Sequence, residues 1–434
     1  MVITLIILVG ILAYAWILYP AVMLWLGRAG SRPWAMGCEQ NAGWLPPVAV
    51  LFSAHNEEAV ILKRLENLAA LDYPADHFHV FVGIDGGSDR TAEIAQEWAK
   101  AHGNVHVLVS SKNHGKTAML KLLKTQLLSR SVVELFSTGT RGISSPTIQQ
   151  SNRPITFPSE VTERVSTITD LLLVFTDANT FFSPDALRHL VSPFIDPKIG
   201  GVCGQLIFLD DAGTETRENL YWRVETLLKT AESQMDSCLG ANGAIYAVRP
   251  ELFWDEIPDS TIIDDFVIGM KVRERGFRML YAPQAMAHEQ TPARIADEWR
   301  RRVRIGAGAF QAMSHCGVCL SPQYGRFSLF FWSHKILRWF TPHLMALLAV
   351  TAMVNLLYGV GRSVVVAVVI LVAGAGFVSL AIIGRLIGAS SRLKAFEYFL
   401  SMQAALFVGF LRYCRGGLKG SWERTERRGA NPHV

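Results

Sequence analysis

The apolar residues between positions 45 and 290 occur in short runs of strand length, and each run is followed by a segment with helical character. The runs that we expect to form buried strands are 48–53, 78–84, 105–109, 171–176 and 202–208. Strands that alternate with helices build parallel, right-handed α/β sheets. The pattern therefore predicts an α/β domain with a mostly parallel sheet over residues 45–290.

The apolar pattern is different at the two ends of the chain. Residues 2–26 carry no charge, and Arg28 and Arg32 follow directly. Residues 341–360 and 363–384 are also uncharged and long enough to cross a hydrocarbon core. We predict an N-terminal transmembrane helix over residues 1–27, with a cytoplasmic C-terminal flank, and membrane helices within residues 341–414. A cleaved signal peptide is disfavoured, because a basic region and a small-residue cleavage site are missing.

Residues 398–411 leave two interpretations open. This apolar segment is short for a span, and basic residues flank it on both sides. If Lys and Arg mark cytoplasmic loops, both flanks lie inside and the segment is interfacial or re-entrant; otherwise it is a short tilted span. The mixture of basic and aromatic residues over 291–340 predicts interfacial amphipathic helices, and residues 415–434 predict a basic cytoplasmic tail.

Residues 131–169 interrupt the alternation of strands and helices. This segment is rich in Ser, Thr, Pro and Gln and has little apolar periodicity. A structureless segment of this length is uncommon inside a compact domain and is usually functional or disordered. We predict a flexible cytosolic insertion without catalytic residues.

Composition supports a membrane protein. The chain is 50% hydrophobic and 18% charged, and its mean hydropathy is +0.24, which is too apolar for a purely soluble protein. The net charge of +5 is mild, and no basic stripe interleaved with aromatics is present, so nucleic acid is not an expected partner. The six Cys residues are scattered, which argues against a disulfide framework, and Cys316 with Cys319 makes a poor zinc site.

Polar residues follow the predicted strands. Asp177 directly follows a buried apolar run, and Asn179 lies two residues further on. The carboxyl edge of an open α/β sheet is where ligands bind, and carboxylates with phosphates are the usual ligands of a hard divalent cation. Asp177 and Asn179 are therefore a candidate metal and diphosphate site, although Asp after a strand is also common turn chemistry. Asp264 and Asp265 begin a predicted helix, where they could simply act as caps.

Five motifs occur in order along the chain, and an Arg-rich helix follows the last of them. The motifs are Ala54-His55-Asn56-Glu57-Glu58, Asp85-Gly86-Gly87-Ser88-Asp89, Asn113-His114-Gly115-Lys116, Thr176-Asp177-Ala178-Asn179 and Asp264-Asp265. This ordered set resembles the membrane-bound family-2 glycosyltransferases, which include relatives of bacterial cellulose, hyaluronan, chitin-oligosaccharide and poly-N-acetylglucosamine synthases. The resemblance extends from about residue 45 to residue 338. It implies a GT-A-like nucleotide-sugar domain on the cytoplasmic side of the bacterial cytoplasmic membrane.

The resemblance also implies a donor site for a UDP-sugar. In it, Asp85 accepts a hydrogen bond from the uracil ring, Lys116 neutralises the diphosphate, and Arg301 is a further candidate for binding the nucleotide-sugar. Asp177 is implied as a ligand of Mg²⁺ or Mn²⁺, and Asn179 stands where the family often has a second Asp. His288 is a further candidate ligand. The residues implied to line the nucleoside pocket are Ala54, Asn56 and Glu57, and Ser88 is a further candidate for binding the nucleotide-sugar.

Asp265 matches the family's catalytic base, and Asp264 is the alternative base. The base removes a proton from the acceptor hydroxyl as this oxygen attacks the anomeric carbon, and a single displacement inverts the configuration. Arg304 matches an arginine that holds the leaving diphosphate. Asn242 and Gly243, in a Gly-rich turn before a strand, belong to the expected acceptor region.

The largest departure from the family lies in the helix that the resemblance assigns to acceptor binding. Processive synthases carry Gln-x-x-Arg-Trp, whereas this chain has Arg301 in place of Gln and Ile305 in place of Trp. An Ile side chain cannot stack on a sugar ring as an aromatic platform does. We therefore expect transfer of one or a few sugars to a lipid-linked or growing glycan acceptor, in exopolysaccharide or cell-envelope glycan synthesis.

Other readings of the same residues are weaker. A processive polysaccharide synthase is the enzymatic alternative, and an inactive membrane scaffold or export component is the non-enzymatic one. A P-loop would need Gly where Ser110 stands. Arg300 and Arg304 have the spacing of a cyclic-dinucleotide contact, but such pairs are ordinary on an interfacial helix. Expected partners besides donor and acceptor are membrane lipids and other polysaccharide-synthesis or export proteins.

Overall fold

The computed structural model describes residues 2–29, 43–129, 170–209, 220–290, 295–387 and 393–416. They fall into two compact units. The sheet unit comprises Arg32–Thr216, Ser233–Asp297 and Lys419–Val434, and the helical unit comprises Met1–Ser31, Arg217–Glu232 and Glu298–Leu418. The predicted flexible insertion 131–169 and residues 417–434 of the predicted basic tail lie outside the described residues.

The sheet unit is built on one sheet with the strand order β3-β2-β1-β4-β7-β6-β8-β5. Four of the strands that the apolar runs predicted are neighbours in this sheet and are parallel to one another. They are β1 (Val48–Ala54), β2 (Phe78–Asp85), β3 (Val105–Ser110) and β4 (Leu172–Thr176). Parallel strands in one sheet direct their carboxyl ends, and thus the predicted motifs, to the same edge.

The other half of the sheet makes it mixed. Strands β7 (Ile245–Val248) and β6 (Ile199–Leu209) continue the sheet as an antiparallel pair, and β7 is also antiparallel to β4. Strand β8 (Arg278–Gln290) is parallel to β6, and the short β5 (Thr180–Phe182) is antiparallel to β8. Strands β5 and β8 were not predicted, because β5 has three residues and Pro283 interrupts the apolar pattern of β8.

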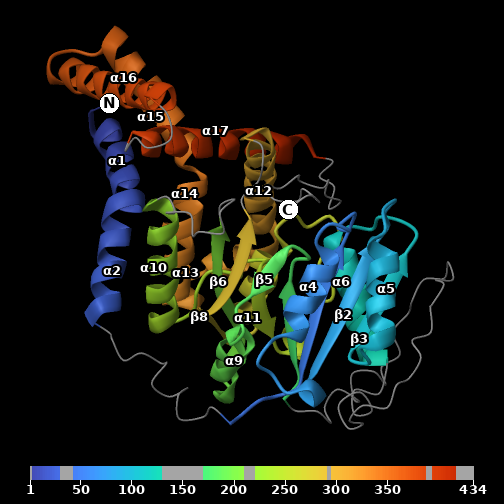
Figure 1. Cartoon of the computed structure of the whole chain (residues 1–434). Coiled ribbons are helices and arrows are strands. Elements are labelled where there is room, and N and C mark those ends of the chain that lie inside the picture. Colours follow the sequence, from blue (N-terminus) through green and yellow to red (C-terminus); the bar gives the residue numbers. More distant parts are fainter. Residues whose placement is uncertain are drawn as a thin grey trace. The chain divides into compact units, whose positions relative to one another are not determined.

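Helices cover the sheet and explain why its first strands read as continuous apolar runs. All seven residues of β1 and all five of β4 are buried, as expected for parallel strands covered on both faces. Figure 1 shows α4, α5 and α6 beside the parallel strands. The helices and short 3₁₀ segments of this unit are α4 (Ile61–Ala69), η3 (Ala75–His77), α5 (Thr91–Ala101), α6 (Lys116–Ser129), α9 (Ala186–Val191), η4 (Ser192–Ile195), η5 (Pro250–Leu252) and α11 (Asp264–Glu274).

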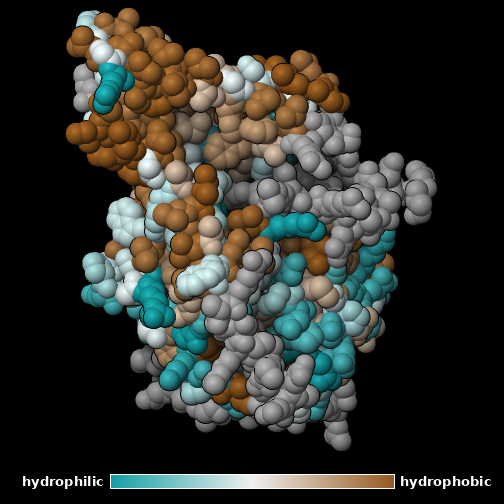
Figure 2. Space-filling view, turned by 90° about the vertical axis from the view of Figure 1, so that its left-hand side faces the viewer, coloured by the Kyte–Doolittle hydropathy of each residue, from teal (hydrophilic) through white to brown (hydrophobic). Residues whose placement is uncertain are grey.

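The helical unit contains three helices that are long and apolar enough to cross a membrane, counted over the described residues: Val2–Gly27, Thr341–Tyr358 and Arg362–Ile387. They agree with the predicted spans. Side chains such as Val369, Val372 and Leu386 are exposed, and Figure 2 shows a continuous hydrophobic surface over this part of the chain. Helix α17 (Lys394–Arg415) is longer than the predicted segment 398–411, because it includes charged residues at both ends. It is not one of the three candidate spans in the described part of the chain.

The remaining elements of the helical unit are mostly short. The N-terminal span consists of α1 (Val2–Ala13), a π-helical turn η1 (Tyr14–Leu18) and α2 (Tyr19–Ala29). Helices α15 (Thr341–Tyr358) and α16 (Arg362–Ile387) are the other two spans. The predicted interfacial region contains α12 (Ile295–Cys316), η6 (Gly317–Leu320), η7 (Pro322–Tyr324), α13 (Arg326–Phe330), the π-helical η8 (Phe331–Ile336) and α14 (Leu337–Trp339), while α10 (Leu220–Met235) enters the unit from earlier in the chain.

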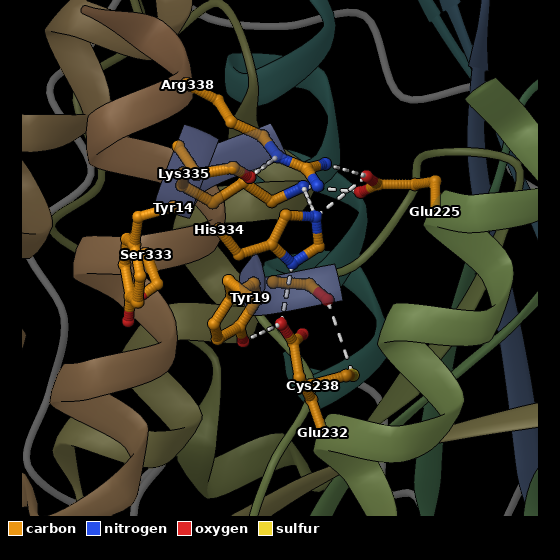
Figure 3. Close-up of polar contacts among 11 residues, drawn as sticks. Tyr14, Tyr19, Glu225, Glu232, Cys238, Ser333, His334, Lys335 and Arg338 are labelled. Carbon is orange, nitrogen blue, oxygen red and sulfur yellow. Dashed lines mark hydrogen bonds and ion pairs between the residues drawn. The ribbon is translucent and has the colours of Figure 1, made fainter. Parts of the chain in front are cut away.

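A buried cluster of charges joins three segments of the helical unit (Figure 3). His334 of η8 lies between two carboxylates of α10, with Nε2 2.8 Å from Glu225 and Nδ1 2.6 Å from Glu232. Lys335 also pairs with Glu225, and the Tyr19 hydroxyl donates to Glu232 over 2.8 Å. Burial alone would raise the pKa of Glu225, but the charges of His334 and Lys335 hold it well below its ordinary range. The cluster thus connects the N-terminal span to α10 and η8.

We predict that His334→Phe lowers the free energy of unfolding of the helical unit by about 3–5 kcal/mol, because it removes the side chain that bridges the two buried carboxylates Glu225 and Glu232. Ser333→Ala is the matched control, since it removes only the neutral 2.8 Å hydrogen bond between Tyr14 and Ser333 and should cost about 0.5–1.5 kcal/mol. Thermal or denaturant unfolding in detergent measures both. Equal losses in the two variants would contradict a charge-dependent role for the cluster.

Candidate active site

The pairing of β4 with β7 creates the centre of the site. Thr176, the last residue of β4, is opposite Ile245, the first residue of β7, in antiparallel register. The residues just beyond this pair, Asp177 and Ala244, are therefore brought to the same edge of the sheet. The Thr176 hydroxyl donates a 2.7 Å hydrogen bond to the Ala244 carbonyl and fixes this approach. The predicted metal motif and the Gly-rich turn thus lie side by side.

Gly243 is the point where the predicted catalytic and donor-binding side chains meet. A Cβ atom at this position would lie 3.1 Å from Lys116 Nζ, 3.3 Å from Asp265 Oδ2 and 3.4 Å from Asp177 Oδ2. Three charged side chains from three separate motifs therefore surround one backbone position without a side chain of its own. The prediction assigned Gly243 to the acceptor region, and the structure puts it among these three groups.

Lys116 and Asp177 form an ion pair, with Nζ 2.6 Å from Oδ1. Their side chains are 19% and 31% exposed, so both remain accessible to a ligand. Burial alone would lower the pKa of Lys116, but Asp177, Asp264 and Asp265 outweigh it and raise this pKa above its ordinary value. The ammonium group is thus held in its charged form, which suits the binding of a diphosphate.

Asp264 and Asp265 begin α11, and two glycines allow this helix to approach the loop. A Cβ on Gly240 would lie 2.4 Å from the Phe266 ring, and one on Gly269 would lie 2.7 Å from the backbone of Ala241. Larger residues at either position would push α11 away from the loop that carries Gly243. This close packing explains how a helix terminus delivers two carboxylates to the site.

The two carboxylates have different surroundings. Asp264 is buried, its Oδ2 atom has no hydrogen-bond partner within the described residues, and burial raises its pKa. Burial, reinforced by the charge of Asp264 and opposed by Lys116, raises the pKa of Asp265 to about 6. Asp265 Oδ1 accepts the Phe266 N–H over 2.8 Å, while Oδ2 faces Gly243. A carboxylate with a pKa near the working pH is suited to act as a general base.

The residues predicted to bind the nucleoside form an interlocked set of loops. Asp85 is buried, and its two carboxylate oxygens accept the N–H groups of His114 and Gly115, each over 2.7 Å. An ionised carboxylate has about four lone-pair sites, so Asp85 can still accept a further N–H from a ligand. Asp85 therefore orders the loop that precedes α6, and it can still accept a hydrogen bond from a nucleobase. This loop leads directly to Lys116.

Asn56 connects the first two motifs. It has a φ of 55°, a region that Asn tolerates better than most residues, and its Oδ1 accepts the Ser88 N–H over 2.9 Å. Ala54 at the end of β1 is fully buried, and the N–H of the buried Glu57 donates to Thr91 over 2.8 Å. The structure thus brings these predicted residues together, while their contacts with a nucleoside stay a prediction.

The three candidate metal ligands, Asp177, Asn179 and His288, have different surroundings. Asp177 Oδ2 points to the same position as Asp265 Oδ2, beside Gly243, so oxygen donors that suit Mg²⁺ or Mn²⁺ are present. The amide nitrogen of the buried Asn179 lies 3.5 Å from Glu289 Oε1. His288 lies near the C-terminal end of β8, opposite Phe181 and Ile207. Over the described residues, no group of three His, Cys, Asp or Glu side chains is arranged to hold a metal.

Of the predicted site residues, one has a structural role in its own loop and two belong to the helical unit. The Asn242 amide donates to the Gly204 carbonyl over 2.9 Å, and its oxygen accepts the Ile245 N–H, so this side chain shapes the loop. Arg301 and Arg304 lie on α12 of the helical unit. Their contacts with a donor stay a prediction.

Sequence reasoning missed two buried residues next to the site. Arg64 is fully buried beneath the Asp177 turn, and its Nη2 donates to the Thr176 hydroxyl. Tyr246 stacks on Phe175, and burial together with the nearby Asp264 raises its pKa well above the ordinary value. Arg64 has a sequence signal, because it occupies the helical apolar face that Ile61 and Leu68 also occupy.

A family model described as glycosyltransferase like family 2 matches residues 46–308. This is more than half of the 434 residues, so the chain belongs to this family. The resemblance that the sequence motifs indicated is thereby confirmed. The match includes every motif that meets at Gly243.

Two curated relatives match parts of the chain. Identity to the probable glycosyltransferase YdaM of Bacillus subtilis (strain 168) is 25% over 281 residues, covering 62% of this chain and 56% of that protein. Identity to the beta-monoglucosyldiacylglycerol synthase of Trichormus variabilis is 44% over 83 residues, covering 19% of this chain and 18% of that protein. The chain thus spans about half the length of the first relative and less than a fifth of the second.

A solved structure confirms the fold. The mannosyltransferase PcManGT from Pyrobaculum calidifontis, in complex with GDP-Man and Mn²⁺, is similar with a TM-score of 0.63 at 18% identity. The similarity covers 95% of this chain and 99% of that chain. The predicted GT-A-like fold, with its mixed sheet and additional helices, is therefore present.

We predict that Gly243→Ala reduces sugar transfer by up to about 100-fold, because a Cβ 3.1–3.4 Å from Lys116 Nζ, Asp265 Oδ2 and Asp177 Oδ2 would force these groups apart, and a displacement of about 1 Å in an active site costs about that much. Gly103→Ala is the matched control, since a Cβ there meets no atom within 4 Å. Turnover and thermal unfolding should be measured for both variants. Wild-type turnover in Gly243→Ala would show that the reacting groups do not converge at this glycine.

Proposed function

We propose that this chain transfers one or a few sugars from a UDP-sugar to a lipid-linked or growing glycan acceptor, with inversion of configuration. The observation that carries the proposal is the convergence of Lys116, Asp177 and Asp265 around Gly243. A positively charged side chain for the diphosphate and a carboxylate of raised pKa, both next to one glycine, are what a single-displacement transfer requires. An inactive scaffold would have no use for both.

Asp265 acts as the base in this mechanism. Its Oδ2 atom takes the proton of the acceptor hydroxyl while the acceptor oxygen forms a bond to the anomeric carbon. The bond between this carbon and the diphosphate oxygen breaks, and the nucleoside diphosphate leaves with both electrons. Asp264 raises the basicity of Asp265 through its charge. Asp264 is therefore a partner of the base in this proposal, and the alternative base if Asp265 is not used.

Lys116 and Asp177 hold the leaving group. The ammonium of Lys116 contacts the diphosphate as negative charge develops on it. A divalent cation, Mg²⁺ or Mn²⁺, would be held by Asp177 with Asn179 and would neutralise the departing phosphates. Three carboxylates around one ammonium give the site excess negative charge, so an anionic donor needs such a cation to bind. Asp85 and the loops that it orders would hold the base of the nucleotide.

The acceptor is proposed to reach the site from a membrane. The apolar helices of the helical unit supply a lipid-facing surface, and the exposed Trp299, Leu329 and Trp332 suit a membrane interface. Ile305 in place of an aromatic platform argues for short transfer. The relative that is named as a glycolipid synthase supports a lipid acceptor. We place the protein in the bacterial cytoplasmic membrane with its sheet unit in the cytoplasm.

The test of this function is diphosphate release by purified, detergent-solubilised protein with Mn²⁺. The donors are a panel of UDP-sugars and GDP-mannose, each with and without a membrane lipid extract. The expected result is release from a UDP-sugar that depends on the extract and yields a product with one or a few added sugars. Formation of a long polymer in the absence of the extract would contradict the proposal and identify a processive synthase. Absence of both release and UDP binding would replace it by a scaffold.

We predict that the two carboxylates of α11 respond differently to substitution. Asp265→Asn should retain UDP binding and lose turnover by about 100-fold or more, since general acid–base catalysis contributes about 10²–10⁴-fold. Turnover of the wild type should rise as the pH increases through about 6, because Asp265 must lose its proton to accept another. Asp264→Asn removes a charge that raises this pKa, so its profile should shift to lower pH by about one unit.

Steady-state rates from pH 5 to pH 9 measure this difference, and UDP titration confirms that binding is intact. Loss of turnover in Asp264→Asn but not in Asp265→Asn would exchange the two roles. A flat profile in the wild type would show that neither carboxylate acts as a base in the step that limits the rate.

A further inference from the structure

Arg64 is an unusual residue for the interior of the sheet unit. Its side chain is fully buried on α4, among Ile61, Leu65 and Leu68 of the same apolar face. No carboxylate in the described part of the chain forms an ion pair with it, and its Nε atom has no hydrogen-bond partner there. A buried cation without a paired anion is costly. Such a residue needs a reason beyond packing.

The hydrogen bonds of Arg64 lead to both ends of the turn that carries Asp177. Nη2 donates to the Thr176 hydroxyl over 3.0 Å, directly before the turn. Nη1 donates to Asn67 Oδ1 over 2.8 Å. Asn67 in turn accepts the Phe182 N–H over 2.8 Å and donates to the Phe182 carbonyl over 2.9 Å, shortly after the turn. One guanidinium thus fixes both flanks of the segment from Asp177 to Phe181.

The same network reaches the catalytic loop. The Thr176 hydroxyl that accepts from Arg64 donates to the Ala244 carbonyl over 2.7 Å. Ala244 follows Gly243, the position where Lys116, Asp177 and Asp265 meet. A chain of two hydrogen bonds therefore connects Arg64 to the loop on the other side of the site. Strengthening along such a chain is expected in a buried environment.

The charge of Arg64 is also close enough to be felt in the site. Burial lowers the pKa of Arg64 to about 9, and the negative charge of Asp177 opposes this shift. The guanidinium remains protonated at neutral pH and lies over the Phe182 ring, with Cζ 4.4 Å from the centroid. The aromatic face and Asp177 together compensate part of the cost of burying the charge.

We propose that Arg64 is a positioning residue that sets the Asp177 turn and the Gly243 loop in the geometry that the donor diphosphate and its cation need. This proposal rests on the proposed function. Arg64 does not touch the donor; it acts through Thr176 and Asn67. Its planar fork of donors makes both links at once, which a lysine cannot do.

The test compares Arg64→Met, Arg64→Lys and Thr176→Val with Leu68→Ala. Leu68 is buried on the same face of α4, and its truncation destabilises the unit without touching the network. UDP affinity, the Mn²⁺ concentration for half-maximal turnover and kcat are measured for each variant beside thermal unfolding. Thr176→Val keeps the side-chain shape and interrupts the links to Arg64 and Ala244, so it tests the network even if Arg64→Met folds poorly.

We expect Arg64→Met to raise the half-saturating Mn²⁺ concentration about tenfold and to lower kcat by about 10–100-fold. Arg64→Lys should recover part of both losses, Thr176→Val should show the same pattern, and Leu68→Ala should keep wild-type values despite a lower melting temperature. Values for Arg64→Met and Thr176→Val within twofold of Leu68→Ala would overturn the proposal and leave only a structural role. A wild type that binds no nucleotide would instead refute the proposed function itself.

Discussion

The site depends on the balance between one ammonium group and three carboxylates. Lys116 pairs with Asp177 over 2.6 Å, and the charges of Asp177, Asp264 and Asp265 together raise its pKa although burial opposes this. Burial, reinforced by the charge of Asp264, raises the pKa of Asp265 to about 6. Without the three carboxylates, burial would lower the pKa of Lys116. A carboxyl group with a pKa near neutrality and an ammonium group held in its charged form thus arise from burial together with one electrostatic arrangement.

The backbone makes this arrangement possible. Antiparallel pairing of β4 with β7 places Asp177 next to the Gly243 loop, and the glycines of that loop and of α11 allow Asp265 to approach. The Thr176 hydroxyl, held by Arg64, connects the two sides. Substitutions at Arg64 or Gly269 would therefore change activity by moving Asp177, Asp265 or the Gly243 loop, although neither residue is proposed to contact the donor.

The sequence predicted the parts of this account that depend on local pattern. The apolar runs located β1, β2, β3 and β4, because strands covered on both faces must be apolar throughout. Motif residues such as Asp85 and Asp177 lie at the predicted sheet edge, because they occur at or just after the carboxyl ends of these parallel strands. The uncharged stretches likewise located the three candidate spans.

What the sequence could not show depends on contacts between distant segments. No local pattern states that β7 runs antiparallel to β4, so the meeting of Gly243 with Lys116 was not foreseen. The cluster around His334 combines residues from three parts of the chain. Strand β8 was hidden because Pro283 and Gln284 interrupt its apolar pattern. Pairing of remote elements, rather than propensity, decides these features.

A structure of the detergent-solubilised protein with UDP and Mn²⁺ would show directly whether a nucleoside diphosphate binds at Gly243 between Lys116 and Asp177. We expect the β-phosphate to contact Lys116 Nζ, Asp177 to ligate the ion, and Asp265 Oδ2 to face the position of the missing sugar. Density for UDP and Mn²⁺ at another place in the sheet unit, with the ion pair between Lys116 and Asp177 intact, would contradict this expectation.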